Sequence, residues 1–429
     1  MSEHSAPAIP RRDFTLLMLA TVTALCNFAP LMTVVPLWAA GGGGSGAGVG
    51  ATNGVMLGAT AITQLAMGPV LARFTLKQIF VAGAAVMAAP TPFYLLSDQL
   101  APVLVISAAR GVGFGLLVVA ASALVAEIVP SRLLARGLGI HGLGTGLPMV
   151  IALPAGVWVA RQWSFTPVFV ASTVLAVVGA VLASLLHAGG RPADERPGPA
   201  AGSVLLDPSV EADHTAGATD LLESPPAEAQ VRAGAATRKR RIGQPGVLGA
   251  IGPLLRPALA FFSLTMALGA VNTFLPLAVP DASVVSLALV VAPLAMITGR
   301  FGSGVLAGHL QPGRLVLPGA VVGAVGMAAL ALGAAPGMSS WLVVAGAGVF
   351  GLGLGVNQND SLVVIMGRAG PRRRGLASTV WNFAYDAGMG SGAVIFGALL
   401  AGIDYPWAYG LAAVVIAVAA PVGRVRVGR

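Results

Sequence analysis

The chain has 429 residues, of which 56% are hydrophobic and only 10% are charged, and its mean hydropathy is +0.85. A soluble domain carries charge on roughly a quarter of its residues, so this composition indicates an integral membrane protein. The net charge of +9 does not suggest a nucleic-acid partner, because excess arginine in a membrane protein usually marks the cytoplasmic side. The lone Cys26 permits no intramolecular disulfide, and no zinc-type spacing occurs. We therefore expect no metal and no cofactor.

The apolar pattern predicts an all-α integral membrane protein with twelve transmembrane helices. Residues 1–13 form a short polar tail, and the first apolar segment is too long for the core of a signal peptide. More spans follow it, so we interpret it as a retained first helix. The expected spans are 14–38, 49–72, 78–97, 102–128, 138–160, 165–187, 257–280, 284–308, 315–335, 340–366, 375–400 and 407–423.

A polar interval, residues 188–254, separates two groups of six spans. It is rich in Pro and acids, lacks aromatics and ends with the basic run Arg238–Arg241. This composition predicts a disordered linker. We expect its basic run to lie near anionic lipid headgroups, with a regulatory or partner-binding role as the alternative. The predicted domains are thus an N-terminal bundle, 14–187, and a C-terminal bundle, 255–423, with a tail at 424–429.

Positive charges fall on one side of this topology. If the N-terminus is cytoplasmic, the outer loops hold only Arg161, and two further arginines, Arg110 and Arg300, lie within spans. All other basic residues then lie on the inner side, which favours an even number of crossings with both termini cytoplasmic. Frequent arginine with almost no lysine is typical of a GC-rich bacterial genome, so we expect a bacterial cytoplasmic membrane.

The two halves resemble each other in sequence. Residues 64–73 parallel residues 300–309 at an offset of 236, and Asn27 of the first span has a counterpart in Asn272 of the seventh. The matches occur at equivalent positions in the spans. A repeat of this kind is typical of duplicated helix bundles with a cavity between them.

At this point the chain resembles the major facilitator superfamily. The loop between spans two and three of that family carries G-x-x-x-D-R-x-G-R-R/K; here Gly68, Arg73 and Lys77 match, but Ala72 replaces the acid. The resemblance covers all but the linker and tails, and implies a carrier that works by alternating access. Because the missing acid removes a contact thought to latch the outward-open state, we expect gating to use other contacts.

Further motifs resemble efflux-type members of this family. Residues 110–115 are similar to the family's arginine-and-glycine motif in span four, residues 142–156 to a degenerate antiporter motif, and residues 381–388 to exporters. The resemblance implies a secondary active transporter that exports a small organic molecule, by proton antiport. The alternatives are an uptake symporter or facilitator and, more remotely, a polytopic membrane enzyme. The scattered positions of the five histidines argue against the enzyme.

The residues that could carry chemistry are few. Asp386 lies near the middle of an apolar run, where a carboxylate costs several kcal/mol unless it is paired, protonated or faces a cavity. Asp360 lies in a polar run of span ten, and Arg300 is expected at a comparable depth. Arg300 could form a permanent ion pair with Asp386 or Asp360. Alternatively, one of the carboxylates takes up a proton in a cavity that water reaches.

The remaining polar residues within spans are candidates for the substrate cavity. Arg110 could bind an anionic substrate, help to move the proton, or only contact helix carbonyls. The other candidates could bind substrate or merely join helices; they are Asn27, Asn272, Asn357, Asn382 and Tyr385. The expected partners are a small-molecule substrate, protons and membrane lipids, with no nucleic acid, and we expect a monomer.

Overall fold

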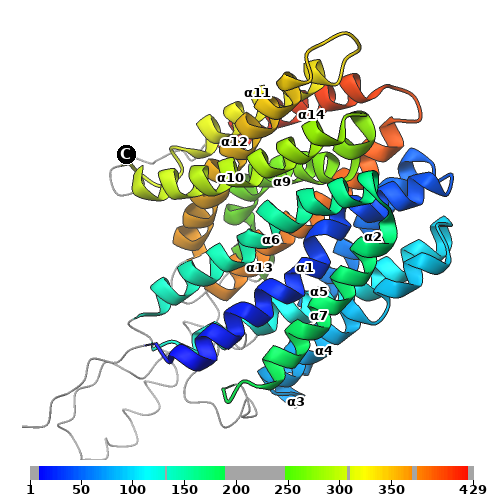
Figure 1. Ribbon diagram of the computed structural model, residues 1–429. Helices are drawn as coiled ribbons and strands as arrows, with labels where there is room; N and C mark the ends of the chain where they lie inside the picture. Colours follow the sequence, from blue (N-terminus) through cyan, green and yellow to red (C-terminus); the bar gives the residue numbers. More distant parts are fainter. Residues whose placement is uncertain (1–8, 131–132, 189–246, 307–309, 370–373, 424–429) are drawn as a thin grey trace, which may run out of the picture.

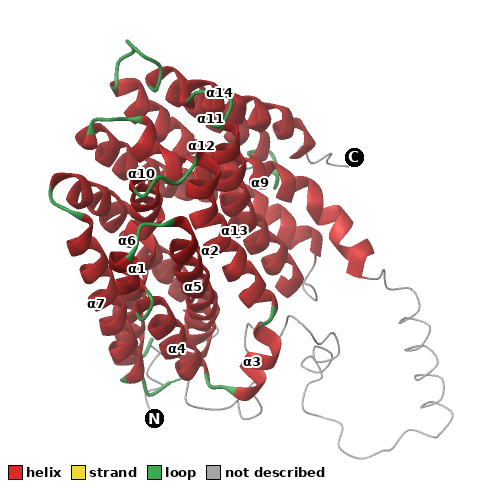
Figure 2. Cartoon of the chain, turned by 90° about the vertical axis from the view of Figure 1, so that its right-hand side faces the viewer, coloured by secondary structure: helices red, strands yellow, loops and turns green. Residues whose placement is uncertain are grey.

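The computed structural model describes residues 9–130, 133–188, 247–306, 310–369 and 374–423, and their regular structure is helical throughout (Figures 1 and 2). The helices of the first half are α1 (Arg11–Gly41), α2 (Gly46–Leu65), α3 (Met67–Arg73), α4 (Leu76–Ala88), η1 (Thr91–Leu96), α5 (Leu100–Ile128), α6 (Leu134–Gln162) and α7 (Phe165–Ser184). Those of the second half are α9 (Val247–Ala278), α10 (Ala282–Leu306), α11 (Val316–Gly333), α12 (Trp341–Ala369), α13 (Arg374–Leu399), α14 (Tyr405–Ala419) and η6 (Ala420–Gly423).

Within the described residues, ten helices are long and apolar enough to cross a membrane, and the bent pair α2 and α3 makes eleven. The axes of this pair meet at 57°. The twelfth long segment is α13, 26 residues in length, which is less apolar because it carries polar residues such as Asn382 and Asp386. The structure therefore confirms an all-helical membrane protein with the expected order of helices.

Local sequence explains where several of these helices begin. The Ser45 side chain accepts a hydrogen bond from Gly48 N (3.3 Å) at the start of α2. Thr75 and Gln78 form a reciprocal capping box at the start of α4. Both caps satisfy backbone N–H groups that the first turn of a helix leaves free. The predicted spans agree with the helices to within a few residues, except that α9 already begins at Val247, inside the predicted linker. Most of that linker, residues 189–246, lies outside the described residues.

The helices form two bundles that lie side by side (Figures 1 and 2). One apolar core, which includes Phe261 and Phe350, is built mainly from α9 to α14. A second core, which includes Phe80 and Leu124, is built mainly from α1 to α7. Three partly buried residues, Met149 of α6, Leu268 of α9 and Tyr385 of α13, pack against both cores. These three side chains therefore lie where the bundles meet.

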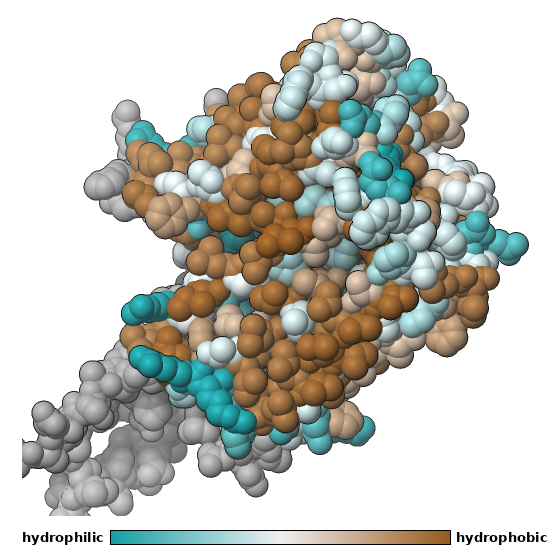
Figure 3. Space-filling view, in the orientation of Figure 1, coloured by the Kyte–Doolittle hydropathy of each residue, from teal (hydrophilic) through white to brown (hydrophobic). Residues whose placement is uncertain are grey.

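The two ends of the bundles differ. The ends at which α1 and α9 begin and α7 terminates form one face, here called the linker face, and the other ends form the opposite face. The side of the molecule toward the viewer in the space-filling view is largely apolar, here called the apolar belt, and a hollow lies between the bundles at the linker face (Figure 3). Arg11, Lys77 and Arg314 lie at helix ends on the linker face, as expected if this face is cytoplasmic.

The opposite ends of α2 and α13 pack backbone against backbone. A methyl group built on Gly50 would overlap the carbonyl oxygen of Ala393, and one built on Gly397 would overlap that of Gly46. Glycine allows this approach because it has no Cβ, as in other close pairs of membrane helices. The bundles are thus joined tightly at the opposite face and are hollow between them at the linker face.

Candidate functional site

Asp386 forms one of the hydrogen bonds that join the two bundles. It lies twelve residues after Arg374, the first residue of α13, hence about 18 Å along the helix axis. Its side chain is 6% exposed. Oδ2 accepts a hydrogen bond of 3.1 Å from Nε2 of Gln64 on α2. A carboxyl group at this depth is therefore shared between the N-terminal and C-terminal bundles and has a neutral amide as its partner.

Among the described residues, Arg300 forms neither of the two ion pairs that the sequence predicts, with Asp386 or with Asp360. The ion pairs found among the described residues involve Asp13 with Arg12 and with His187, and Arg300 is in neither. The side chain of Arg300 is exposed. It interacts electrostatically with Tyr385 of α13, the residue adjacent to Asp386. Arg300, Tyr385 and Asp386 thus form a polar row.

Asp360 stabilises a loop. Its carboxylate accepts hydrogen bonds from the backbone N–H groups of Gly313 (3.0 Å) and Leu315 (2.8 Å), just before α11. Residues 353, 357 and 360 share one side of α12 because a helix repeats every 3.6 residues. Gly353 on that side packs against α11, whereas Gly351 and Gly355 pack against α10, so Asp360 lies on the side of α12 that faces α11. A carboxylate at a helix start is favourable, so this contact explains the buried acid structurally.

Arg110 is held by neutral groups and is only 1% exposed. Its guanidinium donates to the backbone oxygen of Asn27 (3.0 Å) and to Asn27 Oδ1 (3.2 and 3.3 Å). It also donates to the Tyr94 hydroxyl (3.4 Å) and lies 5.8 Å from the centroid of the Tyr94 ring. Asn27 in turn donates to Thr91 Oγ1 and to the Ser172 carbonyl. Of the roles predicted for Arg110, this sealed network favours the local helix contact.

The other predicted cavity residues differ in exposure. Asn357 is fully buried and donates to the Val316 carbonyl (2.8 Å), so it joins α12 to α11. Asn382 donates to the backbone and side-chain oxygens of Ser378 within its own helix. Asn272 is buried on α9 with 8% of its surface exposed. Together with Tyr385, Asn382 is partly accessible, so these two are the best placed to meet a solute.

The predicted gating loop is bonded within the N-terminal bundle. Lys77 Nζ donates to the carbonyls of Ser184 (3.3 Å) and Leu186 (3.0 Å) at the end of α7. Gly68 lies in the short helix α3, and Arg73 is its last residue and is exposed. The equivalent loop of the second half includes residues 307–309, which lie outside the described residues. The contacts of Lys77 support the loop but do not cross to the other bundle.

Two side chains, Arg161 and Asn53, form polar contacts between the bundles at the opposite face. The sequence did not identify either of them as part of a gate. Arg161, near the end of α6, donates to the carbonyls of Pro276, Val279 (3.1 Å) and Pro280 (2.9 Å) around the end of α9. Asn53 of α2 donates to Thr273 Oγ1 of α9 (2.8 Å). Arg161 stood out in the sequence as the lone basic residue of the predicted outer loops. Its partners are backbone oxygens, for which the sequence gives no signal.

An aromatic cluster next to the polar row was also missed. The ring of Trp381 is stacked on Phe261 of α9, with centroids 5.0 Å apart and planes at 12°. Trp381 and Tyr385, one helical turn apart on α13, lie 6.2 Å apart at 16°. The spacing of four residues was a possible signal for this pair, whereas the contribution of Phe261 required the fold. The cluster gives the C-terminal wall a rigid aromatic surface beside Arg300 and Asp386.

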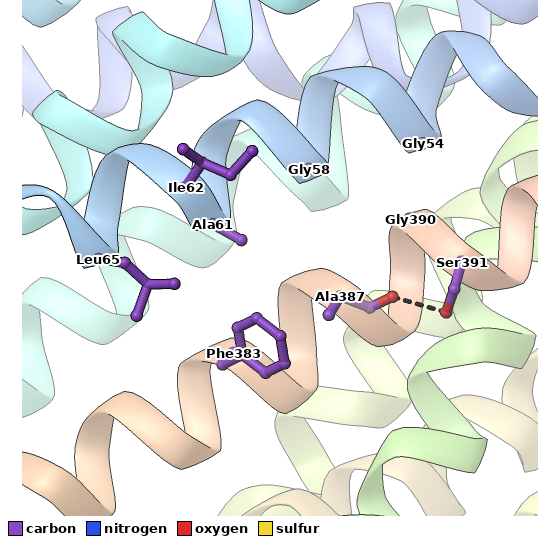
Figure 4. Close-up of a pocket in the computed structure, with 9 residues that line it drawn as sticks. All are labelled: Gly54, Gly58, Ala61, Ile62, Leu65, Phe383, Ala387, Gly390 and Ser391. Carbon is purple, nitrogen blue, oxygen red and sulfur yellow. Dashed lines mark hydrogen bonds between the residues drawn. The ribbon is translucent and has the colours of Figure 1, made fainter.

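The α2–α13 interface opens sideways toward the linker face (Figure 4). A crevice of about 300 Å³ is lined by five residues of α2 between Gly54 and Leu65 and four residues of α13 between Phe383 and Ser391. The helices lie close at Gly54 and Gly390 and diverge toward Leu65 and Phe383 (Figure 4). The crevice therefore begins where the glycine packing ends.

Comparison with known proteins agrees with this architecture. The family model described as Major Facilitator Superfamily matches residues 17–390. The chain belongs to this superfamily. It is therefore a secondary transporter rather than an enzyme. A search of curated proteins found no match.

Solved structures of transporters share the fold at low sequence identity. A peptide transporter, POT, aligns with a TM-score of 0.71 at 15% identity, over 96% of this chain and 93% of its own. A nucleoside transporter, NupG, gives 0.69 at 11%, over 96% and 98%. A bacterial homologue of the human lysosomal transporter Spinster gives 0.67 at 14%, over 97% of both chains. At these identities the likeness establishes the two-bundle fold and not the solute.

Proposed function

We propose that this transporter exports a small organic molecule in exchange for protons, and that Asp386 carries the proton. The observation that supports this role is the hydrogen bond between Asp386 and Gln64, which joins the bundles. Insertion scales put an aspartate at the membrane centre at about 2.5–3.5 kcal/mol. A buried carboxyl group whose hydrogen-bond partner is a neutral amide can lower that cost by binding a proton.

Proton binding at Asp386 would also change the contact between the bundles. A charged carboxylate accepts a stronger hydrogen bond from Gln64 than a neutral carboxyl does. The deprotonated, empty carrier is therefore held open at the linker face, where substrate loads. Protonation weakens the bond and frees the empty carrier to change conformation. The groups that interact with this carboxyl are Gln64 and Tyr385, and Arg300 in turn interacts with Tyr385.

Export rests on the resemblance of the span-five and span-eleven sequences to efflux-type members, and orientation in the bacterial cytoplasmic membrane rests on the basic linker face. Cells that overproduce the protein, loaded with a panel of amphipathic compounds and sugars, test this proposal. At least one compound should accumulate less than in cells without the protein, and an uncoupler or Asp386→Asn should abolish the difference. A difference that persists in both cases overturns proton antiport, and greater accumulation in the overproducing cells indicates uptake instead.

A further inference from the structure

The crevice between α2 and α13 lies on the membrane-facing side of the candidate site. Three of its large side chains are extensively exposed: Ile62 (70%), Leu65 (62%) and Phe383 (47%). All three lie in helices of the apolar belt, where the surrounding medium is hydrocarbon. A solute in the bilayer can therefore reach the crevice without crossing water.

The lining offers apolar contact and almost no polar recognition. Ser391 is the polar side chain among the nine lining residues. Its Oγ donates within α13 to the carbonyls of Ala387 (2.6 Å) and Gly388 (3.2 Å) (Figure 4). The α2 wall is smooth at Gly58, since a Cβ built there would have no neighbour within 4 Å. An occupant is therefore apolar along this length.

The size of the crevice indicates a hydrocarbon chain. An apolar cavity of about 150 Å³ holds benzene, so the 300 Å³ here has room for roughly twelve carbon atoms by that measure. The wide end of the crevice lies toward the linker face, and the narrow end is closed by Gly54 and Gly390 (Figure 4). A chain that enters from the bilayer would thus have its head near the linker face.

The crevice is also next to a hydrogen bond that joins the bundles. Gln64 precedes the lining residue Leu65, and Asp386 precedes the lining residue Ala387. Leu57 and Thr60, on the Gln64 side of α2, are fully buried, so this side of the helix faces the interior. The Gln64–Asp386 bond therefore lies between the crevice and the interior of the carrier.

We propose that this crevice is a lateral entry site that holds the unbranched hydrocarbon tail of an amphipathic solute, with the Gln64–Asp386 bond along its inner wall. The site rests on the proposed transport function and specifies its substrate class. The tail lies against Ile62 and Phe383 while the head remains toward the linker face. The solute then passes from the bilayer into the hollow around the wide end of the crevice, while the Gln64–Asp386 bond keeps the linker face open.

A fatty acid with a photoreactive diazirine in its chain tests the site on purified protein in lipid nanodiscs. Labelled residues should concentrate in segments 54–65 and 383–391, and labelling there should saturate as the probe fraction rises. Gly58→Leu fills the open wall and should reduce labelling of these segments at least about fivefold. Gly139→Leu is the matched control, because Gly139 on α6 is exposed and also has no neighbour within 4 Å of a built Cβ.

Labelling that rises linearly with probe fraction, or that spreads evenly around the apolar belt, would overturn the site without any variant. Equal labelling of the crevice in wild type and Gly58→Leu would also overturn it. A pH titration of the conformational equilibrium in the same samples separates the two proposals. If the response that depends on Asp386 persists while crevice labelling fails, only the lateral entry site is rejected.

Discussion

The arginine at the opposite face provides a direct test of how the bundles are held. Arg161→Gln removes the charge and the planar fork that donates to the carbonyls of Pro276, Val279 and Pro280. These bonds connect α6 of one bundle to the end of α9 in the other. The substitution should therefore loosen the contact between the two bundles at the opposite face and leave each bundle folded.

The magnitude follows from the contacts. Hydrogen bonds to charged groups contribute about 1.5–3 kcal/mol when buried, but Arg161 is only partly buried and water can replace part of each bond. We take about 1–2 kcal/mol in total, which changes the ratio of the two conformations about five- to thirtyfold. Asp281 also interacts with Arg161, but it is exposed, and surface pairs contribute little. In Arg161→Lys the ratio of the two conformations should lie between those of wild type and Arg161→Gln, because a lysine cannot reach three carbonyls at once.

Spin-label distances measure this shift. With Cys26 replaced by alanine, labels at Gln99→Cys and Met338→Cys report on the opposite face, since both positions are exposed at helix ends there. Labels at Phe74→Cys and Arg314→Cys report on the linker face. Arg161→Gln should lengthen the first distance and shorten the second. Unchanged distances at both faces, with only a lower thermal midpoint, would refute the latch and make Arg161 a general stabilising contact.

Three further substitutions test other parts of the structure. Gly50→Ala should separate α2 from α13 at the opposite face, because the added methyl group overlaps a backbone oxygen, and the same label pairs would show an unchanged distance if this packing were not essential. Arg110→Met should lower the free energy of unfolding by about 2 kcal/mol or more, since it leaves the buried oxygens of Asn27 without a donor; a thermal midpoint equal to wild type would contradict the structural role. Gln64→Leu should shift the linker-face label distance away from the open form, and by much less in an Asp386→Asn background, and equal shifts in the two backgrounds would show that the two side chains act independently.

The fold could be predicted well because each membrane-spanning helix leaves a strong signal in the sequence, namely a long apolar run. Long apolar runs predicted the all-helical membrane fold and the order of its helices. The bend between α2 and α3 and the early start of α9 could not be predicted. These depend on how the helix ends pack, which a hydropathy pattern does not contain.

The site could be predicted only in part. Asp386 was identifiable because a carboxylate in an apolar run has a high energetic cost. Its partner was not, since the sequence offered Arg300 and the structure gives Gln64 from the other bundle. Asp360 had the same signal as Asp386, yet its partners are backbone N–H groups. Depth along a helix can be counted from sequence, but the direction a side chain faces depends on its neighbours.

The central claim is that a proton on Asp386 controls the opening of the linker face. The most direct measurement is the distance between labels at Phe74→Cys and Arg314→Cys in nanodiscs as the pH is lowered. Protonation weakens the Gln64–Asp386 bond, so acid should shift the population away from the form that is open at the linker face. In Asp386→Asn, an uncharged side chain of the same shape, the distribution should not depend on pH. A pH response of equal size in wild type and Asp386→Asn would contradict the account.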